Sequence, residues 1–262
     1  MASSWNIIRE GSRGVLLAVD FSRTARPEAG FEEFSSLLDP QWGVWLTRQP
    51  DAAPSTVPGG KDYLAAWTRE VEDSGITVGA VLGYCVGSVF AARIGEYAER
   101  DGTRPPVVLV DPEPPTRRSL IKDFTRATSQ FSSLFSAPEQ EERHRTVQRW
   151  ADECEVFRAF GAALDAEFRS AAEQAFIRAG VAEATRAEYT EELGMRFASL
   201  ISYNVAAFET DAEPEWSDQV VVRSSGPESW PTPDTRQVRF DVSHSDILRT
   251  ETVADFVASL LA

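Results

Sequence analysis

A cysteine between two glycines is the segment of this sequence best suited to chemistry. Residues 83–87 read Gly-Tyr-Cys-Val-Gly, between an apolar run typical of a strand and a segment with helical periodicity. This is the context of the G-x-S-x-G nucleophile elbow, with cysteine in place of serine. We predict Cys85 as a nucleophile and expect a helix N-terminus and a nearby imidazole to favour its thiolate. The alternative is a buried structural cysteine beside packing glycines.

An acid and a base follow Cys85 in the chain. Asp111 ends the next strand-like run, and a carboxylate there lies at the sheet edge that holds the elbow. Of the two histidines, His144 lies in a charged helical stretch and is interpreted as a surface residue. His244 lies between the last strand-like run and the last helix, where a loop can bring it over the elbow. We therefore predict Asp111 to orient His244, and His244 to take the proton of Cys85.

Two further parts of this site are less defined by the sequence. Asp234 and Asp241 are rival acids, because some enzymes with this order of nucleophile, acid and base take the acid from a later strand. The oxyanion hole would use the backbone N–H of Val86 and a second N–H near Phe21, in the loop after the first strand. That loop lacks a glycine-rich motif, which leaves the second donor open.

The elements that must position these residues alternate along the first half of the chain. Short apolar runs predict strands at 14–20, 42–47, 77–82, 106–110, 219–223 and 237–241. Helical spacing predicts helices at 31–38, 63–72, 89–98 and 247–262. The stretch from 116 to 208 has helical spacing throughout and fits several helices, about four, with breaks expected at Gly161, Gly180 and Gly194.

This alternation predicts an α/β fold, a mostly parallel sheet with a helical lid insertion. We expect one domain over 1–262, with its core at 1–115 and 216–262 and the lid at about 116–215. An insertion of that size between late strands is typical of a lid or cap.

Composition excludes several other classes of protein. The chain has 26 Lys and Arg against 41 Asp and Glu, a net charge of −15, which disfavours nucleic acid and anionic membranes as partners. No transmembrane run or secretory signal is visible, so a cytoplasmic location with Cys85 and Cys154 reduced is expected. The spacing of His and Cys supports no metal site, and no cofactor is expected.

Three segments resemble the α/β-hydrolase thioesterases of nonribosomal peptide and polyketide assembly lines. They are residues 83–88, 110–115 and 242–248. The resemblance implies a Cys85–His244–Asp111 triad and an acyl group carried as a thioester on an acyl or peptidyl carrier protein, or on a coenzyme-A-like thiol. It implies release by hydrolysis, acyl transfer or cyclisation, and a free-standing enzyme acting in trans. Most of the family carries serine at the nucleophile, and cysteine favours transfer or ring closure, because a thioester acyl-enzyme stays activated.

A basic face is the predicted contact for such a carrier. Arg118, Lys122 and Arg126 recur at a spacing of four residues at the start of the helical stretch, on an otherwise acidic chain. They are suited to a pantetheine phosphate or an acidic carrier protein. A solvated helix face with no ligand is an equally good interpretation.

Two other functions compete with a thioesterase-like enzyme. Dienelactone hydrolases also use a G-Y-C-x-G elbow, but their acid lies later in the chain, so Asp111 and the long helical stretch argue against that family. A non-catalytic binding protein with the same fold is the second alternative. It would be favoured if His244 pointed away from Cys85, and labelling of Cys85 at neutral pH would test its thiolate character.

Overall fold

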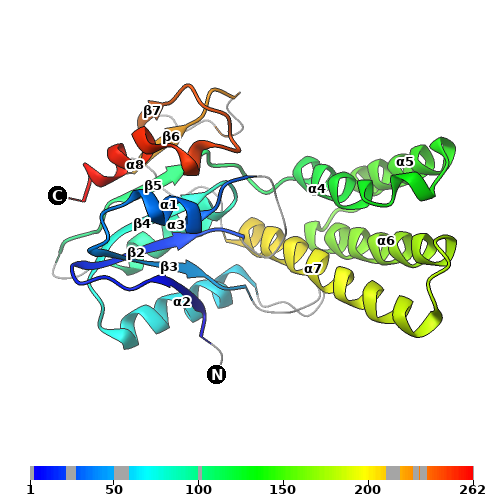
Figure 1. Ribbon diagram of the computed structural model, residues 1–262, viewed down its shortest axis with the longest axis horizontal. Coiled ribbons are helices and arrows are strands. Elements are labelled where there is room, and N and C mark those ends of the chain that lie inside the picture. The colour runs from blue at the N-terminus through cyan, green and yellow to red at the C-terminus, as the bar shows by residue number, and fades with distance from the viewer. Residues whose placement is uncertain are drawn as a thin grey trace. The chain divides into compact units, whose positions relative to one another are not determined.

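A computed structural model describes residues 3–21, 28–49, 59–99, 102–210, 219–226, 230 and 235–261 of the chain. Within these ranges, strands form one seven-stranded sheet in the order β1-β3-β2-β4-β5-β6-β7 (Figure 1). The strands are β1 (Trp5–Arg9), β2 (Gly14–Val19), β3 (Trp42–Thr47), β4 (Val78–Tyr84), β5 (Val107–Val110), β6 (Val220–Arg223) and β7 (Arg236–Arg239).

All strand pairs except β1–β3 are parallel, so the predicted mostly parallel sheet is confirmed. The edge strand β1 runs antiparallel to β3, and the sequence did not predict it. It has five residues, of which Trp5 is buried while Ile7 is 48% exposed. Its sequence, Trp-Asn-Ile-Ile-Arg, lacks the continuous apolar run by which the inner strands are predicted.

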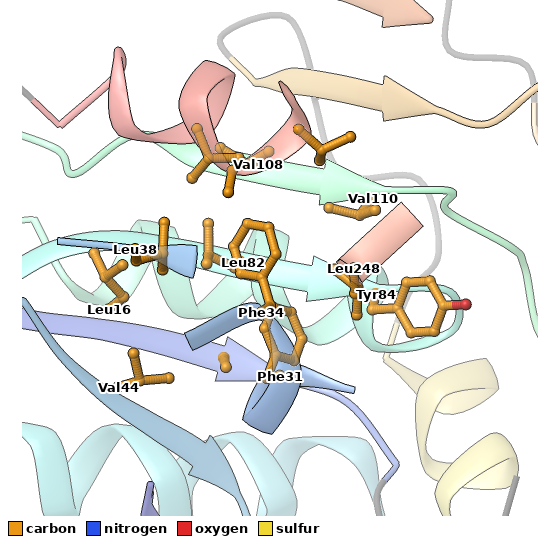
Figure 2. Close-up of a cluster of buried hydrophobic side chains, with 14 of the residues drawn as sticks. Leu16, Phe31, Phe34, Leu38, Val44, Leu82, Tyr84, Val108, Val110 and Leu248 are labelled. Carbon is orange, nitrogen blue, oxygen red and sulfur yellow. The ribbon is translucent and has the colours of Figure 1, made fainter. Parts of the chain in front are cut away.

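Helices cover both faces of the sheet. The helices α1 (Phe31–Leu37) and α8 (Glu251–Ala258) share one buried cluster with alternate residues of β2 to β6. Phe31 and Phe34 of α1 and Leu82 of β4 belong to this cluster (Figure 2). The helices α2 (Gly60–Ser74) and α3 (Gly87–Tyr97) lie on the other face of the sheet, where α3 contacts β4 and β5. The two helices also contact each other, and the ring of Trp67 lies edge-on to that of Phe90. The strands β2 to β6 are thus buried on both faces.

The predicted last helix is divided in the structure. A short 3-10 helix, η2 (Ile247–Arg249), precedes α8, and the extended residue Thr250 separates them. The Thr250 hydroxyl donates to the Asp246 carbonyl at 2.8 Å, which holds the break in place. The loop that carries His244 is therefore followed at once by a short anchored turn, whose Ile247 and Leu248 are fully buried.

The chain divides into two compact units. The first comprises Met1–Gln49, Gly59–Pro114 and Glu209–Ala262, and it contains the sheet; the second contains Pro115–Phe208. In the second unit lie α4 (Arg117–Ser129), η1 (Ser132–Leu134), α5 (Ala137–Glu153), α6 (Phe157–Arg178) and most of α7 (Glu183–Glu209). The described residues of this stretch thus form four α-helices, as the sequence predicts, and one short 3-10 helix, which it does not.

Only one of the three predicted glycine breaks in this stretch is correct. Gly180, with φ of 72°, lies between α6 and α7, where a left-handed residue ends a helix. Gly161 and Gly194 lie inside α6 and α7, so the prediction of breaks there is wrong. A Cβ on Gly161 would lie 2.7 Å from Ile201 Cγ2, which shows that this glycine allows close helix packing instead.

Candidate active site

The strand β4 and the helix α3 place Cys85 on a sharp turn between them. Cys85 has a φ of 51°, a conformation that few non-glycine residues adopt. Its N–H donates to the Val110 carbonyl at 3.0 Å, and its carbonyl accepts the Ser88 N–H at 3.1 Å. A Cβ on Gly83 would lie 2.6 Å from Ala91 Cβ, so glycine is required where the strand passes under the helix. The local geometry is that of a nucleophile elbow.

Asp111 lies beside Cys85 at the same sheet edge. In the parallel pair β4–β5, Tyr84 is opposite Val110, and Cys85 and Asp111 follow one residue later. The predicted placement of these two residues on adjacent strands is confirmed. Asp111 also has a positive φ, 43°, and its N–H donates to the Val222 carbonyl of β6 at 2.8 Å. Both turns out of the sheet are therefore fixed by backbone hydrogen bonds.

The imidazole of His244 meets the carboxylate of Asp111. The Nδ1 atom of His244 lies 2.9 Å from Asp111 Oδ2, and the Ser224 N–H donates to Asp111 Oδ1 at 2.8 Å. Burial raises the pKa of Asp111, but the hydrogen bonds from His244 and Ser224 outweigh burial and hold it below its ordinary value. Of the rival acids, Asp241 is exposed and Asp234 lies outside the described residues.

The other nitrogen of His244 contacts a residue that the sequence did not single out. The buried Tyr84 hydroxyl lies 2.9 Å from His244 Nε2 and 3.0 Å from the His244 carbonyl oxygen. The two rings are nearly parallel, with centroids 5.0 Å apart. Figure 2 shows the Tyr84 hydroxyl directed away from the apolar cluster. The position of Tyr84 next to Cys85 is the only signal of this contact in the sequence, because a buried tyrosine hydroxyl needs a hydrogen-bond partner.

The Cys85 thiol faces a carboxylate and not the imidazole. It donates to Glu113 Oε2 at 3.4 Å, and no hydrogen bond joins it to His244 in the described part of the chain. Burial raises the pKa of the Cys85 thiol well above its ordinary value, and the charge of Glu113 raises it further. The expectation that the site favours thiolate is therefore wrong for this arrangement. The N–H of Val86 acts in the opposite sense but does not reverse the shift.

The two predicted oxyanion donors differ in their surroundings. Val86 follows Cys85 at the start of α3, and its N–H interacts with the thiol. The Phe21 N–H donates to Asp20 Oδ1 at 2.7 Å, and Asp20 is only 2% exposed. A substrate oxygen would have to compete with this carboxylate for the Phe21 N–H. The assignment of Phe21 to an oxyanion hole remains a prediction.

The remaining predicted residues lie on exposed helix faces. Arg118, Lys122 and Arg126 are all exposed on α4, and Arg126 pairs with Asp123 at 3.4 Å. His144 is exposed on α5, as its charged neighbourhood indicates. No helix in the described ranges is long and apolar enough to cross a membrane.

Comparison with known proteins identifies the fold. No family model and no curated protein matches the chain. Among solved structures, an α/β hydrolase from Sphaerobacter thermophilus is similar over 98% of this chain and 96% of its own, with 13% identity and a TM-score of 0.56. The RedJ thioesterase from the prodiginine biosynthetic pathway in Streptomyces coelicolor is similar over 94% of this chain and 89% of its own, with 15% identity and a TM-score of 0.51.

The Vlm2 thioesterase domain is also similar, over 98% of this chain and 95% of its own, with 15% identity and a TM-score of 0.50. Similarity at this level of identity defines the fold alone. Together with the mostly parallel sheet, it confirms the predicted α/β-hydrolase fold.

Proposed function

We propose that this α/β-hydrolase-fold chain is a thioesterase-like enzyme that takes an acyl group from a thioester onto Cys85. The observation that carries the proposal is the elbow itself: a cysteine with positive φ, at the same sheet edge as a hydrogen-bonded Asp111–His244 pair. A nucleophile, an imidazole and a carboxylate gathered at one edge are the parts needed for acyl transfer.

The proposed reaction has two halves. The Cys85 sulfur attacks the thioester carbonyl, the leaving thiol departs, and a thioester acyl-enzyme remains. This exchange of one thioester for another is nearly balanced in energy. In the second half, His244 Nε2 takes a proton from water, a hydroxyl or an amine, which then attacks the acyl-enzyme. Asp111 orients the imidazole and stabilises its charged form.

A carrier-bound acyl group is the proposed substrate. The exposed cations Arg118, Lys122 and Arg126 on α4 give this acidic chain a local positive face. Such a face suits the phosphate of a phosphopantetheine arm or an acidic carrier protein. Release by hydrolysis, transfer or cyclisation remains within the proposal.

A non-catalytic binding protein is the second candidate. The observation that favours it is the contact of His244 Nε2 with the Tyr84 hydroxyl, because Nε2 is the nitrogen that should serve the reacting groups. Against a dienelactone-hydrolase type of enzyme stands the Asp111–His244 pair, since that family takes its acid from later in the chain.

Release of free thiol from a series of acyl-pantetheine thioesters, and from an acylated carrier protein, tests the proposal. We expect the wild type and Cys154→Ala to release thiol and Cys85→Ala to release none above buffer. Cys154→Ala is the matched control, since it removes the other thiol of the chain. Absence of release by the wild type from every donor would favour the binding protein.

A further inference from the structure

Glu113 contacts the proposed nucleophile at two points. Its backbone N–H donates to the Cys85 carbonyl at 3.3 Å, and its Oε2 accepts the Cys85 thiol at 3.4 Å. The first contact joins the chain after β5 to the elbow after β4. The second contact places the Glu113 carboxylate beside the sulfur that would attack the substrate. Glu113 is thus part of the elbow's own hydrogen-bond network.

The chain around Glu113 fixes this placement. Pro112 and Pro114 flank it, and proline rings hold their own φ while restricting the residue before them. Pro112 is buried, and Glu113 and Pro114 are partly buried. Two residues earlier, Asp111 is held by β6 and by Ser224. The segment therefore presents one carboxylate to the imidazole and another to the sulfur.

Within the described residues, no hydrogen bond joins the imidazole of His244 to the Cys85 thiol. Nδ1 contacts Asp111 Oδ2 and Nε2 contacts the Tyr84 hydroxyl, each at 2.9 Å. The proton acceptor that the thiol meets in this arrangement is Glu113. A neutral thiol is a poor nucleophile, so a base in contact with it has a chemical role to fill.

We propose that Glu113 is the general base for acylation of Cys85, an inference that rests on the proposed function. As the sulfur forms its bond to the thioester carbonyl carbon, the thiol proton passes to Glu113 Oε2. When the tetrahedral intermediate collapses, the bond to the leaving sulfur breaks, and that sulfur takes the proton from Glu113. One acyl group and one proton have exchanged places, and Glu113 is again a carboxylate.

The two half-reactions would thus use two different bases. Glu113 serves the sulfur chemistry of acylation, and the His244–Asp111 pair serves the acceptor that removes the acyl group. The division also explains how a thiol beside two carboxylates, Glu113 and the more distant Asp20, could react at all. Their charge disfavours a free thiolate, but a base in contact removes the proton only as the new bond forms.

Alkylation and acylation of Cys85 should respond to Glu113 in opposite ways if Glu113 is a general base. This difference distinguishes a base from a carboxylate that takes no part in proton transfer. Alkylation by iodoacetamide consumes thiolate alone, so it speeds up when the negative charge beside the sulfur is removed. Acylation by a thioester also needs the proton to be accepted and returned. In Glu113→Gln, we expect faster alkylation at neutral pH and acylation slower by about 10²-fold or more.

The experiment measures both rates by intact-protein mass spectrometry, with an acyl-pantetheine thioester as the donor. All variants carry Cys154→Ala, so that Cys85 is the only thiol. Glu113→Asp keeps the charge but withdraws the oxygen from the sulfur, and we expect slow alkylation with slowed acylation. Glu72→Gln, the same change at an exposed residue of α2, should leave both rates unchanged.

Three outcomes would contradict the inference. If both rates rise in Glu113→Gln, Glu113 only suppresses the thiolate. If both fall, its role is structural. If acylation in Glu113→Gln equals that of the parent, another group takes the proton. Failure of the proposed function gives a different result. The Cys154→Ala parent would then be alkylated at Cys85 but would not be acylated by any donor, and the inference about Glu113 would fail with the proposed function.

Discussion

The two cysteines of the chain lie in regions that hold a thiol in different ways. Cys85 follows a strand on a turn with positive φ, and its thiol donates to Glu113. Cys154 ends the helix α5, where its N–H donates to the Trp150 carbonyl and its carbonyl accepts from Arg117. Within the described residues, the Cys154 thiol makes no hydrogen bond, and its side chain packs beside the aromatic core of the helical unit.

The difference shows that backbone geometry decides which polar side chains gather around each cysteine. The sheet edge brings the ends of β4, β5 and β6 to one level, so polar side chains that follow these strands meet each other. A helix end in a packed unit gathers no such set. One cysteine therefore has an acid and an imidazole nearby, while the other serves as a small apolar residue.

The largest effect expected at the Cys85 region comes from Asp111→Asn. The amide cannot hold the imidazole as the carboxylate does, and we expect thiol release to slow by about 10³- to 10⁴-fold. Steady-state kinetics with an acyl-pantetheine thioester measure this change. Asp241→Asn, at the exposed rival acid, is the control that should keep wild-type rates. A loss confined to Asp241→Asn would reverse the assignment.

Alkylation at neutral pH compares the two thiols directly. The raised pKa of Cys85 leaves little thiolate there, so Cys154→Ala, which retains Cys85, should react with iodoacetamide more slowly than Cys85→Ala, which retains Cys154. The rate for Cys85 should increase with pH and continue to increase above the ordinary titration range of a cysteine. A plateau already reached at neutral pH would show that burial and Glu113 do not suppress its ionisation.

The close packing under the elbow gives a smaller but measurable effect on stability. Gly83→Ala puts a Cβ 2.6 Å from Ala91 Cβ and from Ser88 Cα, and overpacking of this kind costs about 1–3 kcal/mol. Urea unfolding would measure the loss in the free energy of unfolding. Equal stability of the variant and the wild type would show that the turn can relax without its glycine.

The smallest expected effect concerns Tyr84. Tyr84→Phe removes the hydroxyl that contacts His244 at Nε2 and at the carbonyl, and a buried hydrogen bond contributes about 1 kcal/mol. We expect a decrease of that size in the free energy of unfolding by urea. Tyr97→Phe, at an exposed tyrosine of α3, is the matched control. A loss equal in both variants would leave the Tyr84 hydroxyl without a specific role.

The sequence predicted the strand-end residues better than their contacts. Cys85 and Asp111 follow apolar runs, and parallel strands bring such positions together by their geometry alone. The contacts of Tyr84 and Glu113 depend on which way a side chain leaves a turn, which no periodicity encodes. Similarly, Gly161 could not be distinguished from a helix break, because its close approach to Ile201 is a tertiary contact.

The edge strand β1 and the break at Thr250 show a second limit of sequence patterns. Both depend on contacts that form only in the folded chain, β1 on its pairing with β3 and the break on the hydrogen bond from the Thr250 hydroxyl to the Asp246 carbonyl. The thiolate expectation for Cys85 failed for a related reason. A helix N-terminus was visible in the sequence, but the burial of the sulfur and the approach of Glu113 were not.

Intact-protein mass spectrometry after incubation with an acyl-pantetheine thioester tests the central claim most directly. We expect the wild type to gain the mass of one acyl group, on the peptide that contains Cys85, and Cys85→Ala to gain none. Treatment with hydroxylamine should remove the adduct, as expected for a thioester. An adduct that persists in Cys85→Ala, or one that maps to Cys154, would contradict the claim that Cys85 accepts the acyl group.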